Sequence, residues 1–102
     1  MKKDKEKVIG EAFSEEKLAL FLQFKPYDES DADFHILLKA YRGLPEEGFE
    51  QFLQLFKRHG RNINAQNHQN ETFLDYISNN LNQQRYVLLM KEAGAVSASQ
   101  LA

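Results

Sequence analysis

The chain has 102 residues, a net charge of −2 at pH 7, no cysteine and no tryptophan. This length suits one domain, and hydrophobic and charged fractions of 42% and 27% are those of a globular protein. The lack of cysteine excludes disulfides, thiolate metal ligands and cysteine nucleophiles, while the slightly acidic balance argues against a nucleic-acid-binding protein.

The N-terminal stretch, residues 1–12, is rich in charge and poor in apolar side chains. Acids interrupt its lysines and no apolar run follows, so the pattern is not that of a secretory signal, and we expect a mobile arm. No later stretch approaches the ~20 apolar residues of a membrane span. We therefore expect a cytoplasmic protein with no membrane contact.

Two helices are predicted in the first half of the chain. Ser14 is a favourable N-cap, acids follow it, and Pro26 stops the apolar run, which predicts a helix at about 14–24. The next helix, at about 31–42, has Ser30 or Asp31 as its cap, places apolar residues at spacings of three and four, and ends at a glycine.

The second half predicts three more helices. A proline and two acids begin the helix at about 45–59, whose apolar positions form the clearest amphipathic stripe of the chain, and Gly60 ends it. Thr72 with Asp75 resembles a capping box at the start of a fourth helix. The fifth, at about 82–93, ends before another glycine, and no strand-like alternation of useful length appears.

Two of these helix ends resemble each other. "FLQLFKRHGRNINA" and "YVLLMKEAGAVSA" each lead through aromatic and leucine residues to a basic residue and, three positions later, a glycine. The glycines, Gly60 and Gly94, are 94 − 60 = 34 residues apart, close to the ~33-residue period of ankyrin repeats.

Residues 60–95 resemble one ankyrin repeat set in its surroundings. The family's hairpin, threonine-leucine segment and helix ending are matched by Gly60, Ile63, Asn64, Ala65, Thr72, Leu74, Leu88, Leu89, Gly94 and Ala95. The chain departs from the family where Asn70 replaces the turn glycine, Phe73 a proline and Asp75 a histidine. The preceding residues, from 31, keep the helix–turn–helix shape, but their "RGLPEEG" turn looks expanded.

The whole chain is also similar to a group of small bacterial ankyrin-like proteins without an established activity, which share its "KKDKEKVIGE" start and its "AYRGL" turn. The resemblance implies one all-α domain over 13–96, an ankyrin-like stack of about two helix–turn–helix units plus an N-terminal capping helix. It also implies a short hairpin-like loop near 60–71, and we expect residues 97–102 to be a flexible tail.

In ankyrin-like proteins, partners meet the hairpin tips and the concave face made by the first helix of each pair. The resemblance therefore implies a non-enzymatic protein-binding module, an adaptor or regulator with an unidentified protein partner. The residues it places on the binding surface are Gln66, Asn67, His68, Gln69, Asn70, Tyr76, Asn79, His35 and Lys39. Asparagine also tolerates left-handed turns and caps helices, so a structural role remains open for each amide residue.

Other kinds of site find less support in the residues. We expect no metal, cofactor or catalytic site, because the three histidines do not pair at ligand spacing, "DESDAD" fails the calcium-loop pattern, and no glycine-rich phosphate loop is present. Nucleic-acid association through the lysine arm and Lys57, Arg58 and Arg61 remains the alternative. A small hydrolase built around His68 and Asp75 is a third hypothesis. A short stack with an exposed end could also form a weak homodimer.

Overall fold

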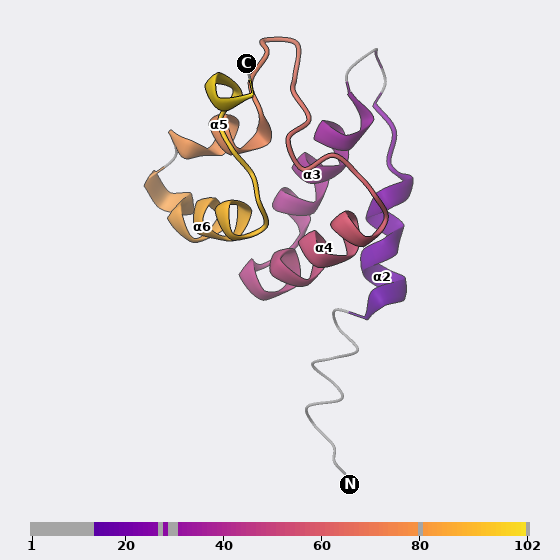
Figure 1. Cartoon of the computed structure of the whole chain (residues 1–102). Coiled ribbons are helices and arrows are strands. Elements are labelled where there is room, and N and C mark those ends of the chain that lie inside the picture. Colours follow the sequence, from indigo (N-terminus) through magenta and orange to yellow (C-terminus); the bar gives the residue numbers. More distant parts are fainter. Residues whose placement is uncertain (1–13, 27, 29–30, 80, 102) are drawn as a thin grey trace, which may run out of the picture.

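The computed structural model describes residues 14–26, 28, 31–79 and 81–101, which form helices joined by connecting segments, the longest of them residues 59–72 (Figure 1). The arm expected at 1–12 lies outside the described residues. No strand forms in these ranges, where β-type pairing is limited to an isolated antiparallel bridge between Gln66 and Thr72. The predicted all-α class is confirmed. None of the described helices has the length and apolar content that crossing a membrane requires.

The first predicted helix begins as an α-helix and tightens into a 3-10 helix. α2 spans Glu15–Ala19 and η1 continues over Leu20–Gln23. Ser14 caps α2 as predicted, because its side chain accepts a backbone N–H at 3.3 Å. The apolar run of this segment enters the core only in part, since Leu20 and Phe24 leave 60% and 42% of their surface exposed.

The next two helices follow their predicted ranges to within one residue. α3 spans Ala32–Gly43 and α4 spans Glu46–Arg58. Asp31 caps α3, its carboxylate accepting two backbone N–H groups at 2.8 and 3.1 Å. The expansion predicted for the connecting turn is wrong, because only Leu44 and Pro45 lie between the two helices. The additional residues of this unit lengthen its helices instead.

The last two α-helices are shorter. α5 spans Phe73–Ser78, and the predicted helix at 82–93 is divided into η2 (Leu81–Gln83) and α6 (Gln84–Glu92). The predicted capping box at the start of α5 is confirmed. The hydroxyl of Thr72 accepts a hydrogen bond from the backbone N–H of Asp75 at 3.2 Å. The backbone N–H of Thr72 donates in return to the carboxylate of Asp75, also at 3.2 Å.

The C-terminal segment contains a turn that the sequence pattern did not predict, η3 (Ala98–Gln100). The backbone N–H of Ala98, the first residue of η3, donates to Asp75 Oδ2 at 2.9 Å. Val96 donates its N–H to Asn64 Oδ1 at 2.8 Å and accepts from the hydroxyl of Thr72 at 2.9 Å. These bonds join the segment to the loop and to the beginning of α5; the mobility expected for residues 97–102 stays a prediction.

The two glycines that are 34 residues apart end their helices in the same way. Gly60 and Gly94 have φ angles of 74° and 102°, the left-handed region that glycine adopts without strain. The N–H of each glycine and of the residue after it bonds back to carbonyls of the last helical turn, at 2.9 to 3.2 Å. This is the Schellman arrangement of a helix C-terminus, and it occurs at both glycines, 34 residues apart.

The helices form two layers (Figure 1). α2, α4 and α6 pack side by side in one layer, and η1, α3 and α5 in the other. The interior between them is apolar, and its largest fully buried side chains are Phe49, Phe52, Phe56, Phe73, Ile36, Leu37, Leu55, Ile77 and Met90. The buried apolar residues of α2, α3, α4, α5 and α6 thus belong to one shared core.

Candidate functional site

The loop between α4 and α5 projects beyond the helices near the beginning of α3 (Figure 1). Asn67 organises its tip: the side-chain oxygen accepts the backbone N–H groups of Gln69 and Glu71, both at 2.9 Å. The amide nitrogen of Asn67 donates to Glu71 Oε1 at 3.0 Å, and its own backbone N–H donates to Glu71 O at 2.9 Å. Asn67, one of the predicted contact residues, is therefore held inside the turn.

Two more of the predicted contact residues shape the same turn. Asn70 has a φ of 63° and is the one non-glycine residue with positive φ in the described chain. Its carbonyl accepts a hydrogen bond from the side chain of Gln66 at 3.1 Å. Asparagine tolerates this left-handed conformation better than most residues, which explains why it can stand at the turn. Gln66, Asn67 and Asn70 thus have structural roles, and their contact with a partner stays a prediction.

His68 and Gln69 occupy the outer part of the tip, and both are exposed. His68 Nε2 lies 4.0 Å from Asp28 Oδ2, and both side chains are about two-thirds exposed, at 64% and 66%. The tip therefore adjoins the segment that leads into α3.

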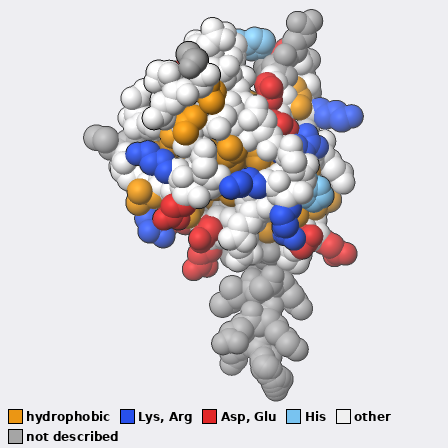
Figure 2. Space-filling view, in the orientation of Figure 1, with side chains coloured by type: hydrophobic (Ala, Val, Ile, Leu, Met, Phe, Trp, Pro, Cys, Tyr) orange, Lys and Arg blue, Asp and Glu red, His pale blue; other side chains and the backbone are white. Residues whose placement is uncertain are grey.

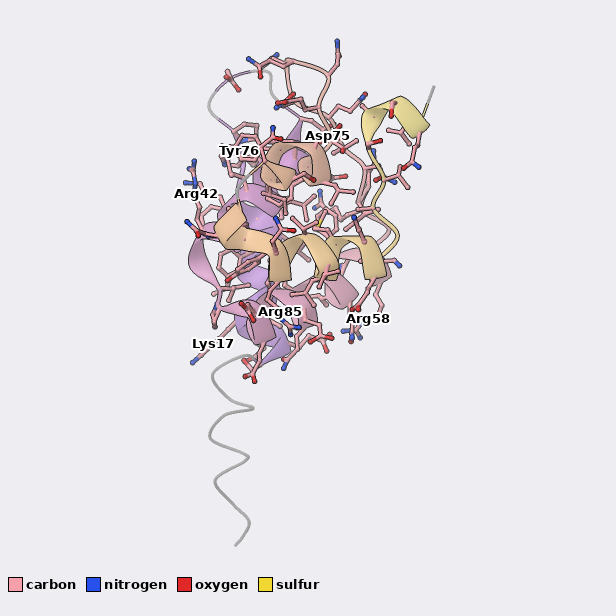
Figure 3. The ribbon with its side chains drawn as sticks, turned by 90° about the vertical axis from the view of Figure 1, so that its left-hand side faces the viewer. Lys17, Arg42, Arg58, Asp75, Tyr76 and Arg85 are labelled. Carbon is pink, nitrogen blue, oxygen red and sulfur yellow. The ribbon has the colours of Figure 1, made fainter. Side chains whose placement is uncertain are left out.

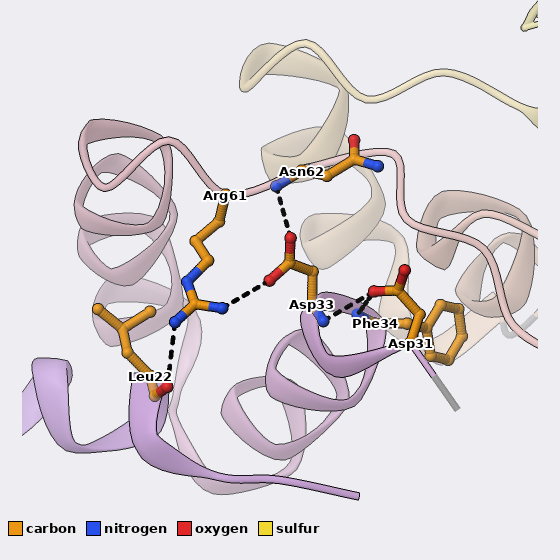
Figure 4. A network of polar contacts seen from close by, with 6 residues as sticks. All are labelled: Leu22, Asp31, Asp33, Phe34, Arg61 and Asn62. Atoms are coloured by element: carbon orange, nitrogen blue, oxygen red, sulfur yellow. Dashed lines mark hydrogen bonds and ion pairs between the residues drawn. The ribbon is translucent and has the colours of Figure 1, made fainter. Parts of the chain in front are cut away.

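The base of the loop is attached to α3 by one carboxylate (Figure 4). Asp33 Oδ1 accepts from Arg61 Nη1 and Asp33 Oδ2 from the backbone N–H of Asn62, both at 2.9 Å. A second guanidinium nitrogen of Arg61 reaches Leu22 O at 3.5 Å. One acidic residue in the first turn of α3 thus connects three segments of the chain and orients the loop.

We call the exposed surface of α3 and its two aromatic borders the inner face. Its central residues are His35, Leu38, Lys39 and Arg42, and at about 100° per residue they fall within an arc of about 100° on the helix. Lys39 Nζ lies 5.7 Å from the centroid of the Phe24 ring. This ring forms the border of the inner face on the side of η1. The predicted contact residues His35 and Lys39 are therefore neighbours on one surface.

Tyr76 of α5 forms the other border of the inner face. Its ring packs edge-on against Phe34 at 5.7 Å and lies tilted by 30° against Phe73 at 5.9 Å, measured between centroids. The side chain nevertheless leaves 41% of its surface exposed. Asn79, the C-cap of α5, is exposed as well. An aromatic ring that is fixed from below and open above is a suitable contact residue.

The pKa of His35, the histidine of the inner face, is shifted by the groups around it. Burial lowers the pKa of His35, the positive charge of Lys39 lowers this pKa further, and the carboxylate of Asp28 opposes both effects. The ring therefore favours its neutral form more than a free histidine does. Lasting positive charge on this face comes from Lys39 and Arg42.

Three residues of the inner face, Leu38, Arg42 and Phe24, were not among the predicted contacts. Arg42 lies three positions after Lys39 and seven after His35, a spacing that places all three on one helix surface and that the sequence already contained. Phe24 was assigned to the apolar side of the first helix, and no local pattern indicated that its ring would lie under Lys39.

Two of the basic residues of the nucleic-acid alternative are paired with acidic residues. Arg61 is engaged by Asp33, and Arg58 Nη2 lies 3.6 Å from Glu15 Oε1. Figure 2 shows basic and acidic side chains interspersed over the side that carries α4 and α6. The lysine arm lies outside the described residues.

His68 and Asp75, the pair suggested for a hydrolase, contact different groups. Asp75 Oδ2 accepts the backbone N–H groups of Thr72 and Ala98, at 3.2 and 2.9 Å, whereas His68 lies beside Asp28. Within the described ranges, no three histidine, aspartate or glutamate side chains are grouped as metal ligands. Hollows occur elsewhere, one of about 280 Å³ between α4 and α6 and one of about 480 Å³ on α2.

Comparisons with family models, with curated proteins and with solved structures find no match to this chain.

Proposed function

We propose that the chain is a non-enzymatic protein–protein interaction module, an adaptor or regulator of the cytoplasm. Its architecture would be a short ankyrin-like stack: the pairs α3–α4 and α5–α6, with α2 as the cap. A protein partner would contact the loop tip and the inner face.

Three observations support the ankyrin-like arrangement. The Schellman ends at Gly60 and Gly94 repeat at 34 residues, the interval that the resemblance to ankyrin repeats requires. First helices pack on first helices and second helices on second helices, as in a repeat stack. Asn70 adopts a left-handed φ at the position where the family has its turn glycine.

The observation that carries the binding proposal is the exposure of Tyr76. A tyrosine that is 41% exposed and supported by two phenylalanine rings offers a large contact area with little conformational entropy left to lose. Other predicted contact residues, the partly exposed His35 and Lys39 on α3 and the exposed His68 and Gln69 at the tip, present polar groups that can orient a partner. This combination is typical of a protein-binding surface.

Affinity capture with mass spectrometry tests the proposal. We expect the wild-type chain to recover a specific protein from a lysate, and two variants to recover less of it: His68→Ala/Gln69→Ala and Tyr76→Ala. A matched control, His59→Ala/Gln51→Ala, replaces the same residue types on α4 and its C-cap, and should leave recovery unchanged. All variants should melt within a few degrees of the wild type.

Equal recovery by the tip variant, the Tyr76 variant and the control would count against this surface. Binding of an oligonucleotide that weakens steeply with added salt, in place of protein capture, would favour the nucleic-acid alternative.

A further inference from the structure

The charges of the inner face are not balanced by acids of the described chain. The chain has four arginines, and three of them pair with a carboxylate: Arg58 with Glu15, Arg61 with Asp33, and Arg85 with Glu46. Arg42 is the exception among the described residues, and it is exposed. Lys39, one helical turn away, contacts an aromatic ring and pairs with no described acid.

The described acids before and at the start of α3 already have partners. Asp31 accepts two backbone N–H groups at the start of α3, and Asp33 holds Arg61 and Asn62. Asp28 lies beside His68 and His35, at the tip end of the face. The face is therefore mixed near the loop tip and positive toward the end of α3.

The geometry of α3 connects the positive end to Tyr76. Phe34, which supports the Tyr76 ring, precedes Arg42 by eight residues, about 80° around the helix and about 12 Å along its axis. Helical side chains lean toward the N-terminus, so that of Arg42 leans toward Tyr76. Figure 3 shows Arg42 and Tyr76 at the same edge of the molecule and Arg58 at the opposite edge. An extended segment of about four residues would span this distance.

We infer that the inner face binds an acidic segment of the partner protein, with carboxylates placed at Lys39 and Arg42 and an apolar or aromatic side chain against Tyr76. This inference rests on the proposed function, since it names the chemistry of the partner at the same surface. A protein segment fits better than a nucleic acid, because two cations flanked by Asp28 and Asp31 offer too little positive charge for a polyphosphate, and the whole chain carries −2.

A displayed library of random peptides provides the first test, with the wild-type chain as bait. We expect enriched peptides to carry at least two acidic residues near one apolar residue. Synthetic copies of these peptides should bind about tenfold more weakly to Lys39→Gln/Arg42→Gln, because each exposed ion pair contributes modestly. Copies with Asn and Gln in place of Asp and Glu should lose a similar factor, and binding of the acidic copies should weaken with added salt.

The control variant is Lys57→Gln/Lys91→Gln, which removes the same charge from exposed residues of α4 and α6. It should bind the acidic peptides as the wild type does. Equal weakening in both double variants would overturn the inference, because net charge rather than the inner face would then explain the binding.

The remaining outcomes separate the inference from the proposed function. Enriched peptides without acids that still depend on Tyr76 would overturn the acidic preference and leave the interaction module in place. The peptide selection could also enrich nothing while lysate capture still depends on His68 and Gln69. This result would likewise overturn the acidic preference and leave the interaction module in place. Failure of both peptide selection and lysate capture would overturn both proposals, as would preferential binding of an oligonucleotide.

Discussion

Asp33, in the first turn of α3, and Arg61, after the end of α4, form a 2.9 Å ion pair that connects positions 28 residues apart. The same carboxylate also accepts the backbone N–H of Asn62 at 2.9 Å. Side-chain exposures of 19% and 36% make this pair the least exposed of the described ion pairs. It attaches the projecting loop to the helix that carries the inner face.

Asp33→Asn should therefore lower the free energy of unfolding by about 1–2 kcal/mol, since charge-assisted hydrogen bonds are lost at a partly shielded site. Chemical denaturation measures the change. Glu15→Gln removes the exposed partner of Arg58 and serves as the control, with an expected loss below about 0.5 kcal/mol. Equal losses in the two variants would mean that the Asp33 network contributes no more than a surface pair.

The left-handed turn at Asn70 gives a second prediction. With a φ of 63°, Asn70→Ala should cost about 1 kcal/mol of stability, because a Cβ without a compensating polar group is strained there. Asn70→Gly should remain within about 0.5 kcal/mol of the wild type, since glycine adopts this φ freely. Thermal or urea unfolding compares them, and Gln69→Ala at the neighbouring position is the control. An alanine variant as stable as the glycine variant would argue against the assigned backbone conformation.

Thr72 gives a third prediction, because its buried hydroxyl accepts from Asp75 N at 3.2 Å and donates to Val96 O at 2.9 Å. Thr72→Val keeps the shape of the side chain and removes both bonds, so we expect a loss of about 1–3 kcal/mol. Thr72→Ser keeps the hydroxyl and should recover most of that loss. Hydrogen exchange at Asp75 and Ala98 would locate the effect, and unchanged protection in the valine variant would contradict it.

The pH dependence of stability gives a fourth prediction. The pKa of His35 is lower in the folded chain than its ordinary value of 6.5, mainly through burial and then through Lys39, against the opposing effect of Asp28. As pH falls through about 6.5, the unfolded chain therefore binds a proton more readily than the folded chain, and stability decreases until the folded pKa is passed.

Urea unfolding between pH 7.5 and 5.5, values chosen to include about one unit on either side of an ordinary histidine pKa, measures this decrease. His35→Gln should show a smaller decrease. The same decrease in the variant would assign the effect to other groups.

Local chemistry was sufficient to predict most of the helices. Ser14, Asp31 and Thr72 cap helices because a side-chain oxygen can satisfy backbone N–H groups that the helix leaves free. Gly60 and Gly94 end helices because they adopt a positive φ without strain. These signals act within a few residues, so they can be read in chain order. The expanded turn before α4 was wrong because the extra residues extend two helices instead of the connection between them.

Spacing along the chain was enough to predict the all-α class, the caps and the 34-residue interval. The composition of the candidate site instead depends on long-range packing. The fold engaged Gln66, Asn67 and Asn70 within the loop and left His68 and Gln69 at its tip. It also placed the Phe24 ring beside Lys39 and the Tyr76 ring against Phe34, at the two borders of the inner face. Arg42 on this face has no acidic partner in the described chain. The contacts of Phe24 and Tyr76 join residues far apart in sequence, and only packing determines which charges find a partner.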